Sequence, residues 1–332
     1  MEQRFLGRDG PAISPIGIGA MSFSDFYGPT SEADSHAILT AALDLGVTHI
    51  DTANIYGAGR SETVIGSFLK ARPGARERFV IATKAAIARD GEGRRHHDNS
   101  AAHLEGELDK SLQRLGVDCV DLFYIHRRDP DLPIEEATGN LARLVGKGKC
   151  RHIGFSEIAP SSLRRAVAVH PVAAVQSEYS LSTRAPDLGL VQTCAELGAA
   201  LVAFSPVGRS LLTDDPLAPA VVATLPFLKG NPRFVEPNLS ANLGATDRFR
   251  QLAAELGVPA AALAIAWLLH RGEHVIPIPG TRSVAHFRDL VAGCDLVLTA
   301  EDMARIDKVL PVGWAHGDRY NADQWVGPER FS

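Results

Sequence analysis

Residues 31–51 read SEADSHAILTAALDLGVTHID, and this stretch predicts one amphipathic helix followed by one buried strand. Ser31 and Asp34 have the spacing of a capping box at the start of a helix. Apolar residues then recur along one helix face, at Ala37, Ile38, Ala41, Ala42 and Leu45. Gly46 follows, and glycine readily adopts the left-handed conformation that ends a helix. The stretch therefore encodes both ends of a helix and the short strand after it.

The same helix and strand unit recurs along the chain. Residues 104–115 and 187–197 each have an apolar face and are followed by Gly116 and Gly198. Short apolar runs without alternation, typical of strands covered on both faces, lie between such helices. We expect these strands at Ile16–Gly19, Thr48–Asp51, Val80–Thr83, Val120–Ile125, His152–Phe155, Ala174–Gln176, Leu201–Phe204 and Val275–Pro277. Eight strands alternating with helices predict an α/β fold, the (β/α)8 TIM barrel.

The length of the chain is compatible with a single barrel. A barrel of this type has about 250 residues, and this chain has 332 with no Gly/Ser-rich or Pro-rich linker. We therefore expect one domain over residues 1–332. A long loop excursion is expected over residues 205–257, before the last two helices. The C-terminal tail, residues 313–332, is expected to fold back over one end of the barrel.

Composition and charge narrow the function classes. Apolar residues make up 45% of the chain and charged residues 22%, as in ordinary globular proteins. The formal net charge of −5 and the lack of a basic block argue against a nucleic-acid partner. The four cysteines form no C-x-x-C pair, and the sequence shows no signal peptide and no apolar run of membrane length. We expect a cytoplasmic protein with reduced thiols and no membrane contact.

Ionisable residues follow three successive predicted strands. Asp51 ends the second strand, Lys84 the third and His126 the fourth, while Tyr56 lies in the loop after Asp51. Because the loops after barrel strands form the active site, these side chains should lie together at the C-terminal end of the barrel. A single residue of this kind is more often a helix cap or a solvated rim residue. Four converging groups favour chemistry.

Together these four groups indicate a site that donates a proton. A free tyrosine has a pKa of about 10, so its phenol is a reluctant acid at neutral pH. We expect the Lys84 ammonium to lower the pKa of Tyr56, and Asp51 to pair with Lys84 and keep it charged. His126 would orient a carbonyl oxygen.

These residues and several later segments resemble the successive signatures of the aldo-keto reductase superfamily. The matching segments are Asp51–Ala53 with Tyr56-Gly57, Ile81–Lys84, Tyr124–His126, Gly154–Glu157, Val175–Leu181, Ala203–Arg209 and Ile276–Arg282, and they span nearly the whole chain. The resemblance implies a barrel enzyme that reduces an aldehyde or ketone with NADP(H), NAD(H) being the alternative cofactor. It also implies that Tyr56 is the general acid, that Lys84 and Asp51 tune it, and that His126 positions the substrate.

The resemblance further implies where the cofactor binds. Ser156 and Gln176 would hydrogen-bond the nicotinamide carboxamide, and Phe204 would stack on the ring. The turn after Phe204 would pass over the pyrophosphate with Ser205, Pro206, Val207, Gly208 and Ser210. Contacts at the adenosine end would come from Gly280, Thr281, Arg282, His286 and Asp289, and Met21 would also touch the cofactor. Arg282 would hold a 2′-phosphate through two parallel hydrogen bonds.

Simpler interpretations of the cofactor region stay open. Gly280–Arg282 also fits a plain surface turn, and Phe204 an ordinary core aromatic. Three positions depart from the usual family pattern, since Ser210 replaces a glycine, Asp289-Leu290 replaces Glu-Asn, and Glu157 replaces an asparagine. The second departure leaves the adenine contact to Asp289.

Three other segments bear on function. Gly17–Ser22 begins like a dinucleotide fingerprint but has serine in place of the third glycine. Residues 94–98, RRHHD, fit a mobile charged loop better than a metal site, and we expect no metal. Phe23, Phe26 and Tyr27 suggest an apolar wall for the substrate.

The leading hypothesis is therefore an NADPH-dependent reductase of a small-molecule aldehyde or ketone. One alternative is a regulatory or binding subunit that senses nicotinamide nucleotides with weak or no turnover. Another is a barrel hydrolase or isomerase without a cofactor. The loops after the strands set the choice of substrate.

Overall fold

The computed structural model describes residues 1–89 and 91–332, and its centre is one sheet of eight parallel strands. In spatial order the strands are β3 (Gly17–Gly19), β4 (His49–Asp51), β5 (Val80–Ala85), β8 (Val120–Ile125), β9 (Cys150–Ser156), β10 (Ala174–Glu178), β11 (Ala200–Phe204) and β12 (Val275–Pro277). The backbone N–H of Gly19 donates to the Pro279 oxygen at 2.9 Å, which brings the first strand against the last. The predicted (β/α)8 barrel is confirmed.

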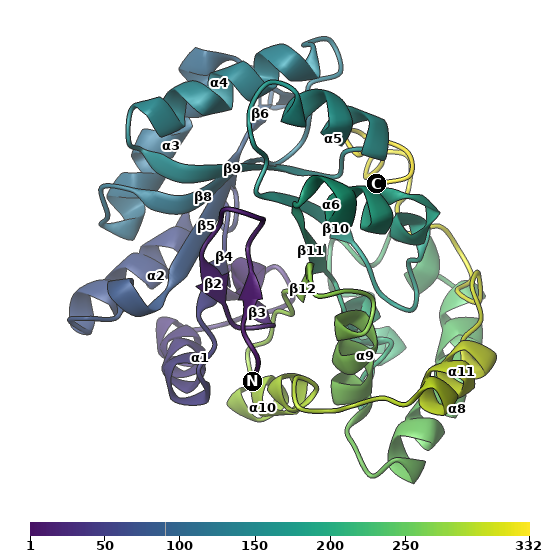
Figure 1. The fold of residues 1–332 in the computed structure, drawn as a ribbon. Helices are drawn as coiled ribbons and strands as arrows, with labels where there is room; N and C mark the ends of the chain where they lie inside the picture. Colours follow the sequence, from purple (N-terminus) through teal and green to yellow (C-terminus); the bar gives the residue numbers. More distant parts are fainter. Residues whose placement is uncertain (90) are drawn as a thin grey trace.

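Helices form the outer ring around these strands (Figure 1). One such helix lies between each barrel strand and the next or after the last strand: α1 (Glu32–Leu45), α2 (Arg60–Ala71), α3 (Ala101–Leu115), α4 (Ile134–Gly146), α5 (Pro160–Val167), α6 (Leu190–Leu197), α9 (Ala260–Leu269) and α10 (Val284–Ala292). The other helices are α7 (Pro219–Val222), α8 (Asn238–Glu255) and α11 (Ala300–Val309). Within the described residues no single helix is long and apolar enough to cross a membrane, although α8 and α9, bent by 88° at their junction, pass that test as a pair.

Local sequence signals fix the helix ends. Ser31 and Asp34 form the predicted capping box at α1, and Gly46, Gly116 and Gly198 end three helices in the left-handed conformation. The predicted helix over 187–197 is too long at its start, because Gly189 has a φ of 139° and separates a short 3-10 turn from α6.

An N-terminal hairpin, which the sequence did not predict, closes one end of the barrel. Strands β1 (Arg4–Phe5) and β2 (Ala12–Ile13) pair antiparallel and precede β3. Leu6 and Ile13 are fully buried and pack with the apolar residues that fill the barrel interior. The opposite end, where the strands finish, is left for a binding site.

A second hairpin extends from the end of β5. Strands β6 (Ile87–Arg89) and β7 (Arg95–His97) pair antiparallel, with Ile87 opposite His97. The prediction of a mobile charged loop over residues 94–98 is therefore wrong, because backbone pairing orders most of this segment. Position 90, between β6 and β7, lies outside the described residues.

Two long segments cover the C-terminal ends of the strands. Residues 205–257 contain two 3-10 turns, α7 and α8, and hold a small apolar cluster that includes Leu211, Leu228 and Phe234. In the tail, the Trp314 indole donates to the Leu181 oxygen at 2.8 Å. The Glu329 N–H donates to the backbone oxygen of Glu157 at 2.9 Å, so the tail lies beside the end of β9.

Candidate active site

The four predicted catalytic side chains gather at the C-terminal ends of neighbouring strands. Lys84 on β5 is fully buried, and its Nζ forms an ion pair with Asp51 at the end of β4. The same nitrogen donates to the Thr52 backbone oxygen at 2.8 Å and to the Tyr56 hydroxyl at 3.4 Å. An ammonium therefore lies directly behind the phenol, as the sequence predicted.

The ammonium of Lys84 is held by neighbours on two sides. Burial lowers the pKa of Lys84, and the Asp51 carboxylate opposes that shift. The other oxygen of Asp51 accepts from the Gln176 side chain at 2.8 Å, so both carboxylate oxygens have partners. Glu62 is buried behind the strand and accepts from Arg114 at 2.6 Å, which adds a second, more distant negative charge.

Tyr56 is a protonated phenol in this structure. Its pKa is raised well above the ordinary value, first by burial and then by the nearby Asp51 carboxylate. The net shift is opposite to the lowering expected from a nearby cation, because burial and the Asp51 carboxylate outweigh the lowering effect of the Arg127 charge. The consequence for chemistry is that Tyr56 carries its proton throughout the neutral pH range.

His126 lies across from Tyr56. The two rings are 5.8 Å apart between centroids and meet edge to face. Burial lowers the pKa of His126 well below its usual value, and the charges of Arg127 and Lys84 lower it further. The imidazole is therefore neutral, and it can donate or accept a hydrogen bond without adding positive charge.

A cavity of about 540 Å³ is lined by Asp51, Tyr56 and His126 and also by residues that follow β12. Its size is within the usual range for small-molecule sites. The predicted residues that line it are Asp51, Tyr56, His126, Met21, Ser156, Gln176, Phe204, Ser205, Pro206, Val207, Ser210, Gly280, Thr281, Arg282, His286 and Asp289. Lys84 and Gly208 do not line it, since Lys84 lies behind Tyr56 and Gly208 is buried in the turn.

The turn after β11 has an unusual backbone. Ser205, Arg209 and Ser210 have φ values of 51°, 54° and 84°, which residues other than glycine rarely adopt. The Ser210 hydroxyl accepts from the Leu217 N–H at 3.0 Å, so this side chain also fixes the turn. A strained and anchored turn at the wall of a cavity is typical of a ligand-binding loop.

The far end of the cavity is built around the start of α10. Ser283 caps this helix, and its side chain accepts from the His286 N–H at 3.4 Å. Arg282 is exposed, and its guanidinium donates to the Pro29 oxygen at 2.9 Å. A helix N-terminus beside an arginine and a histidine is a favourable place for a phosphate group.

These features fit a dinucleotide that carries a nicotinamide. Amide and hydroxyl groups of Gln176 and Ser156 face one end of the cavity, Phe204 provides a flat apolar side, and the α10 terminus faces the other end. The cavity is lined by residues from the ends of β9 to β12, so one elongated ligand can contact all of them.

The structure adds cavity residues that were not among the predicted site residues. Arg127 follows His126, and Arg209, Phe227 and Tyr320 come from the covering segments. The Arg209 guanidinium lies 5.0 Å from the Phe227 ring centroid and 5.6 Å from that of Tyr320. Arg127 and Arg209 lie in loops directly after β8 and β11, within reach of the strand-end rule, whereas Phe227 and Tyr320 depend on how long segments fold back.

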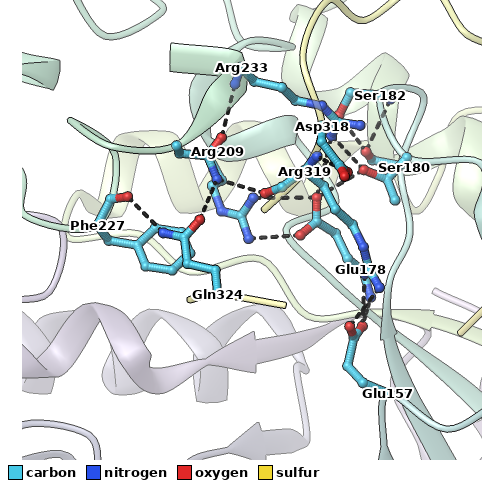
Figure 2. A network of polar contacts seen from close by, with 12 residues as sticks. Glu157, Glu178, Ser180, Ser182, Arg209, Phe227, Arg233, Asp318, Arg319 and Gln324 are labelled. Carbon is cyan, nitrogen blue, oxygen red and sulfur yellow. Dashed lines mark hydrogen bonds and ion pairs between the residues drawn. The ribbon is translucent and has the colours of Figure 1, made fainter. Parts of the chain in front are cut away.

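A buried ionic network lies beside this cavity and joins three segments of the chain (Figure 2). Arg209 donates to Glu178 at 2.7 Å, and Arg233 approaches the same carboxylate at 3.5 Å. Arg319 of the tail pairs with Glu157 at 2.8 Å. Burial would raise the pKa of Glu178, but the surrounding arginines hold it below its usual value. The network therefore attaches the tail and the excursion to the ends of β9 and β10.

The predicted apolar wall is only partly present. Phe26 and Tyr27 line the cavity, as expected. Phe23 is buried in the main core instead, because it lies on the inner side of the 3-10 turn that follows β3.

The chain is similar to known proteins in both sequence and structure. Residues 15–311 match the model of the Aldo/keto reductase family. The chain is 38% identical over 331 residues to "Probable aldo-keto reductase 1" of Glycine max, covering 98% of this chain and 93% of that protein. It is similar to the glycerol dehydrogenase AKR11B4 from Gluconobacter oxydans, with a TM-score of 0.81, 28% identity and 93% and 94% of the two chains covered. It also resembles the aldo-keto reductase AKR11C1 from Bacillus halodurans in its holo form, with a TM-score of 0.76, 26% identity and 98% and 99% covered.

Proposed function

The chain belongs to the aldo/keto reductase family, and from this membership and the geometry of the cavity we propose that it reduces an aldehyde or ketone to the alcohol with NADPH. Members of this family are oxidoreductases that use nicotinamide cofactors and act on small-molecule carbonyl compounds. The observation that carries the proposal is the Tyr56 hydroxyl at the cavity wall, 3.4 Å from the buried Lys84 ammonium.

The bound cofactor would supply a hydride, and the residues of the chain would supply the proton and the positioning. Tyr56 is protonated and donates its proton to the carbonyl oxygen as negative charge develops there. The nearby Lys84 ammonium stabilises the phenolate that remains, and Asp51 holds Lys84 in place. The neutral imidazole of His126 positions the same carbonyl oxygen.

The cofactor would be held along the length of the cavity. Ser156 and Gln176 would bind the carboxamide of the nicotinamide, and Phe204 would pack against its ring. The strained turn at residues 205–210 would cover the pyrophosphate. Arg282 and His286, beside the N-terminus of α10, would face a 2′-phosphate, which favours NADPH over NADH.

A panel of aldehydes and ketones assayed with NADPH and with NADH tests this proposal. We expect loss of NADPH absorbance that depends on the carbonyl compound, with NADH giving a lower kcat/KM. Arg282→Gln should reduce the preference for NADPH about tenfold, because one charge-assisted pair with phosphate is removed. Tight NADPH binding without turnover of any carbonyl would instead favour a nucleotide-sensing subunit.

A further inference from the structure

Arg127 occupies the end of the cavity where the carbonyl would lie. It follows His126 directly, and its guanidinium donates to the His126 backbone oxygen at 2.6 Å and to the Ser156 hydroxyl at 3.0 Å. Its Nε is buried and has no hydrogen-bond partner among the described residues. No carboxylate in the described part of the chain forms an ion pair with it. The side chain is thus oriented by two neutral oxygens and keeps its charge unbalanced.

A second arginine lies on the hairpin beside it. Strand β7 carries Arg95 and His97, and a Cβ placed on Gly327 of the tail would lie 2.6 Å from the His97 ring and 3.1 Å from the Arg127 side chain. The hairpin, the residue after β8 and the tail therefore meet at one point. Burial lowers the pKa of Arg95, and the charge of Arg127 lowers it further. Arg95, like Arg127, has no carboxylate partner among residues 1–89 and 91–332.

Several other charged side chains around this point already form ion pairs of their own. Asp51 forms an ion pair with Lys84. At the ends of β9 and β10, Glu157 pairs with Arg319, and Glu178 pairs with Arg209 and Arg233 (Figure 2). Burial and then the two arginines lower the pKa of His97 to about 4, despite an opposing effect of Asp129. His97 is therefore neutral, and Arg127 and Arg95 are the arginines at this point that have no ion-paired carboxylate among the described residues.

This positive site is separate from the phosphate-binding end of the cavity. Arg127 follows β8, whereas Gly280–Arg282 follow β12, and four steps around an eight-stranded ring place the two on opposite walls. An anion bound at Arg127 would therefore be part of the substrate. Arg127 is partly buried and has no counter-ion among the described residues, which favours a ligand that brings a negative charge, whereas Arg95 is exposed and adds positive charge from the hairpin.

We propose that Arg127, assisted by Arg95, binds an anionic group, a carboxylate or a phosphate, carried by the carbonyl substrate. The inference rests on the proposed reductase function and adds a substrate class to it. Phe26, Tyr27 and Phe227 line the same cavity and would contact the apolar part of such a substrate.

The test compares 4-carboxybenzaldehyde with its methyl ester, which has nearly the same shape and no charge. We expect wild-type kcat/KM to be about tenfold higher for the acid, the effect of one charge-assisted hydrogen bond. Arg127→Met should lower the ratio of acid to ester about tenfold, mainly through KM, and Arg127→Lys should restore part of it. Arg95→Met should lower the ratio by a smaller factor.

A matched control and a second pair of substrates sharpen the result. Arg78→Met removes an exposed arginine that precedes β5, at the opposite end of the barrel, and should leave the ratio unchanged. Glyceraldehyde 3-phosphate against glyceraldehyde shows whether phosphate is preferred to carboxylate. A wild-type ratio near one for both pairs would overturn the inference, as would equal losses for acid and ester in Arg127→Met, which indicate a purely structural role.

A binding experiment, which needs no reaction, distinguishes failure of this inference from failure of the proposed function. If no carbonyl is reduced, the reductase proposal fails, and calorimetric titration with benzoate and benzamide, with and without NADP⁺, still decides the anion site. We expect benzoate to bind and Arg127→Met to weaken it about tenfold, with benzamide binding more weakly throughout. Equal affinity for benzoate and benzamide would contradict the anion site.

Discussion

The pair formed by Lys84 and Asp51 shows how one buried interaction serves both stability and chemistry. Both side chains are almost fully buried, and each is the other's only oppositely charged partner in the described part of the chain. Breaking a buried ion pair by removing one partner typically costs about 3–5 kcal/mol, because the remaining charge is left in a medium that solvates it poorly. Lys84 also lies next to the hydroxyl that is proposed to donate the proton.

Lys84→Met should therefore lower both the free energy of unfolding and kcat. We expect a loss of about 3–5 kcal/mol in urea unfolding and a fall in kcat of about a hundredfold or more. Adding Asp51→Asn should recover a large part of the stability, since the unpaired carboxylate is gone, but none of the activity. Recovery of both in the double variant would show that Lys84 acts only on folding.

The positions of single residues were predictable to different degrees. The loops after parallel strands meet at one end of a barrel, and this rule predicts the clustering of Asp51, Tyr56, Lys84 and His126. The structure brings these four side chains together. The direction of the Tyr56 pKa shift was not predictable, because it depends on how deeply the phenol is buried. The ion pairs of Glu157 and Glu178 were not predictable either, because their arginine partners come from the covering segments.

Among the elements, regular helices and strands were easier to predict than hairpins. The observed bounds of β8, β12 and α1 equal the predicted ones, since each has a clear apolar run or clear end signals. Strands β6 and β7 have three residues each, and β1 and β2 have two. Such short strands carry too few residues for a recognisable pattern, so tertiary contacts decide them.

The β6–β7 hairpin should make stability depend on pH through His97. Its pKa is lowered to about 4 in the folded protein, chiefly by burial and then by Arg95 and Arg127, whereas an unfolded histidine titrates near 6.5. The unfolded chain binds more protons between these values, so the free energy of unfolding falls as pH is lowered from about 6.5 to 4.

We expect His97→Gln to lose less stability than the wild type over this pH range. The difference should be on the order of 1 kcal/mol, smaller than the full shift implies because the side chain is only half-buried and solvent screens it. Urea unfolding at several pH values measures it. Parallel curves for the two proteins would show that His97 titrates normally in the folded state.

The whole molecule separates stability and function between the two ends of the barrel. The N-terminal hairpin inserts Leu6 into the barrel interior at one end, while the cavity and the covering segments lie at the other. The overall barrel was predictable because the helix and strand unit repeats. The sequence predicts an excursion over residues 205–257 and a tail over residues 313–332 but none of their contacts, because these segments have no repeating pattern.

Leu6→Ala should therefore weaken the fold without changing catalysis. We expect a loss of about 2–5 kcal/mol in the free energy of unfolding, as for other buried leucines, and KM and kcat within about twofold of the wild type. Phe5→Ala is the matched control, because Phe5 is 62% exposed and its loss should change stability by only about 0.5 kcal/mol. A large change in KM from Leu6→Ala would mean that the two ends are coupled.

The proton-donating role of Tyr56 is tested most directly by removing its hydroxyl alone. We measure kcat and NADPH affinity for Tyr56→Phe, with Tyr124→Phe as control, since Tyr124 is also buried near Lys84 but does not line the cavity. Tyr56→Phe should lower kcat about a hundredfold or more with NADPH affinity nearly unchanged, while Tyr124→Phe should keep most of its activity. A Tyr56→Phe protein that retains more than about a tenth of the wild-type kcat would contradict the assignment of Tyr56 as the acid.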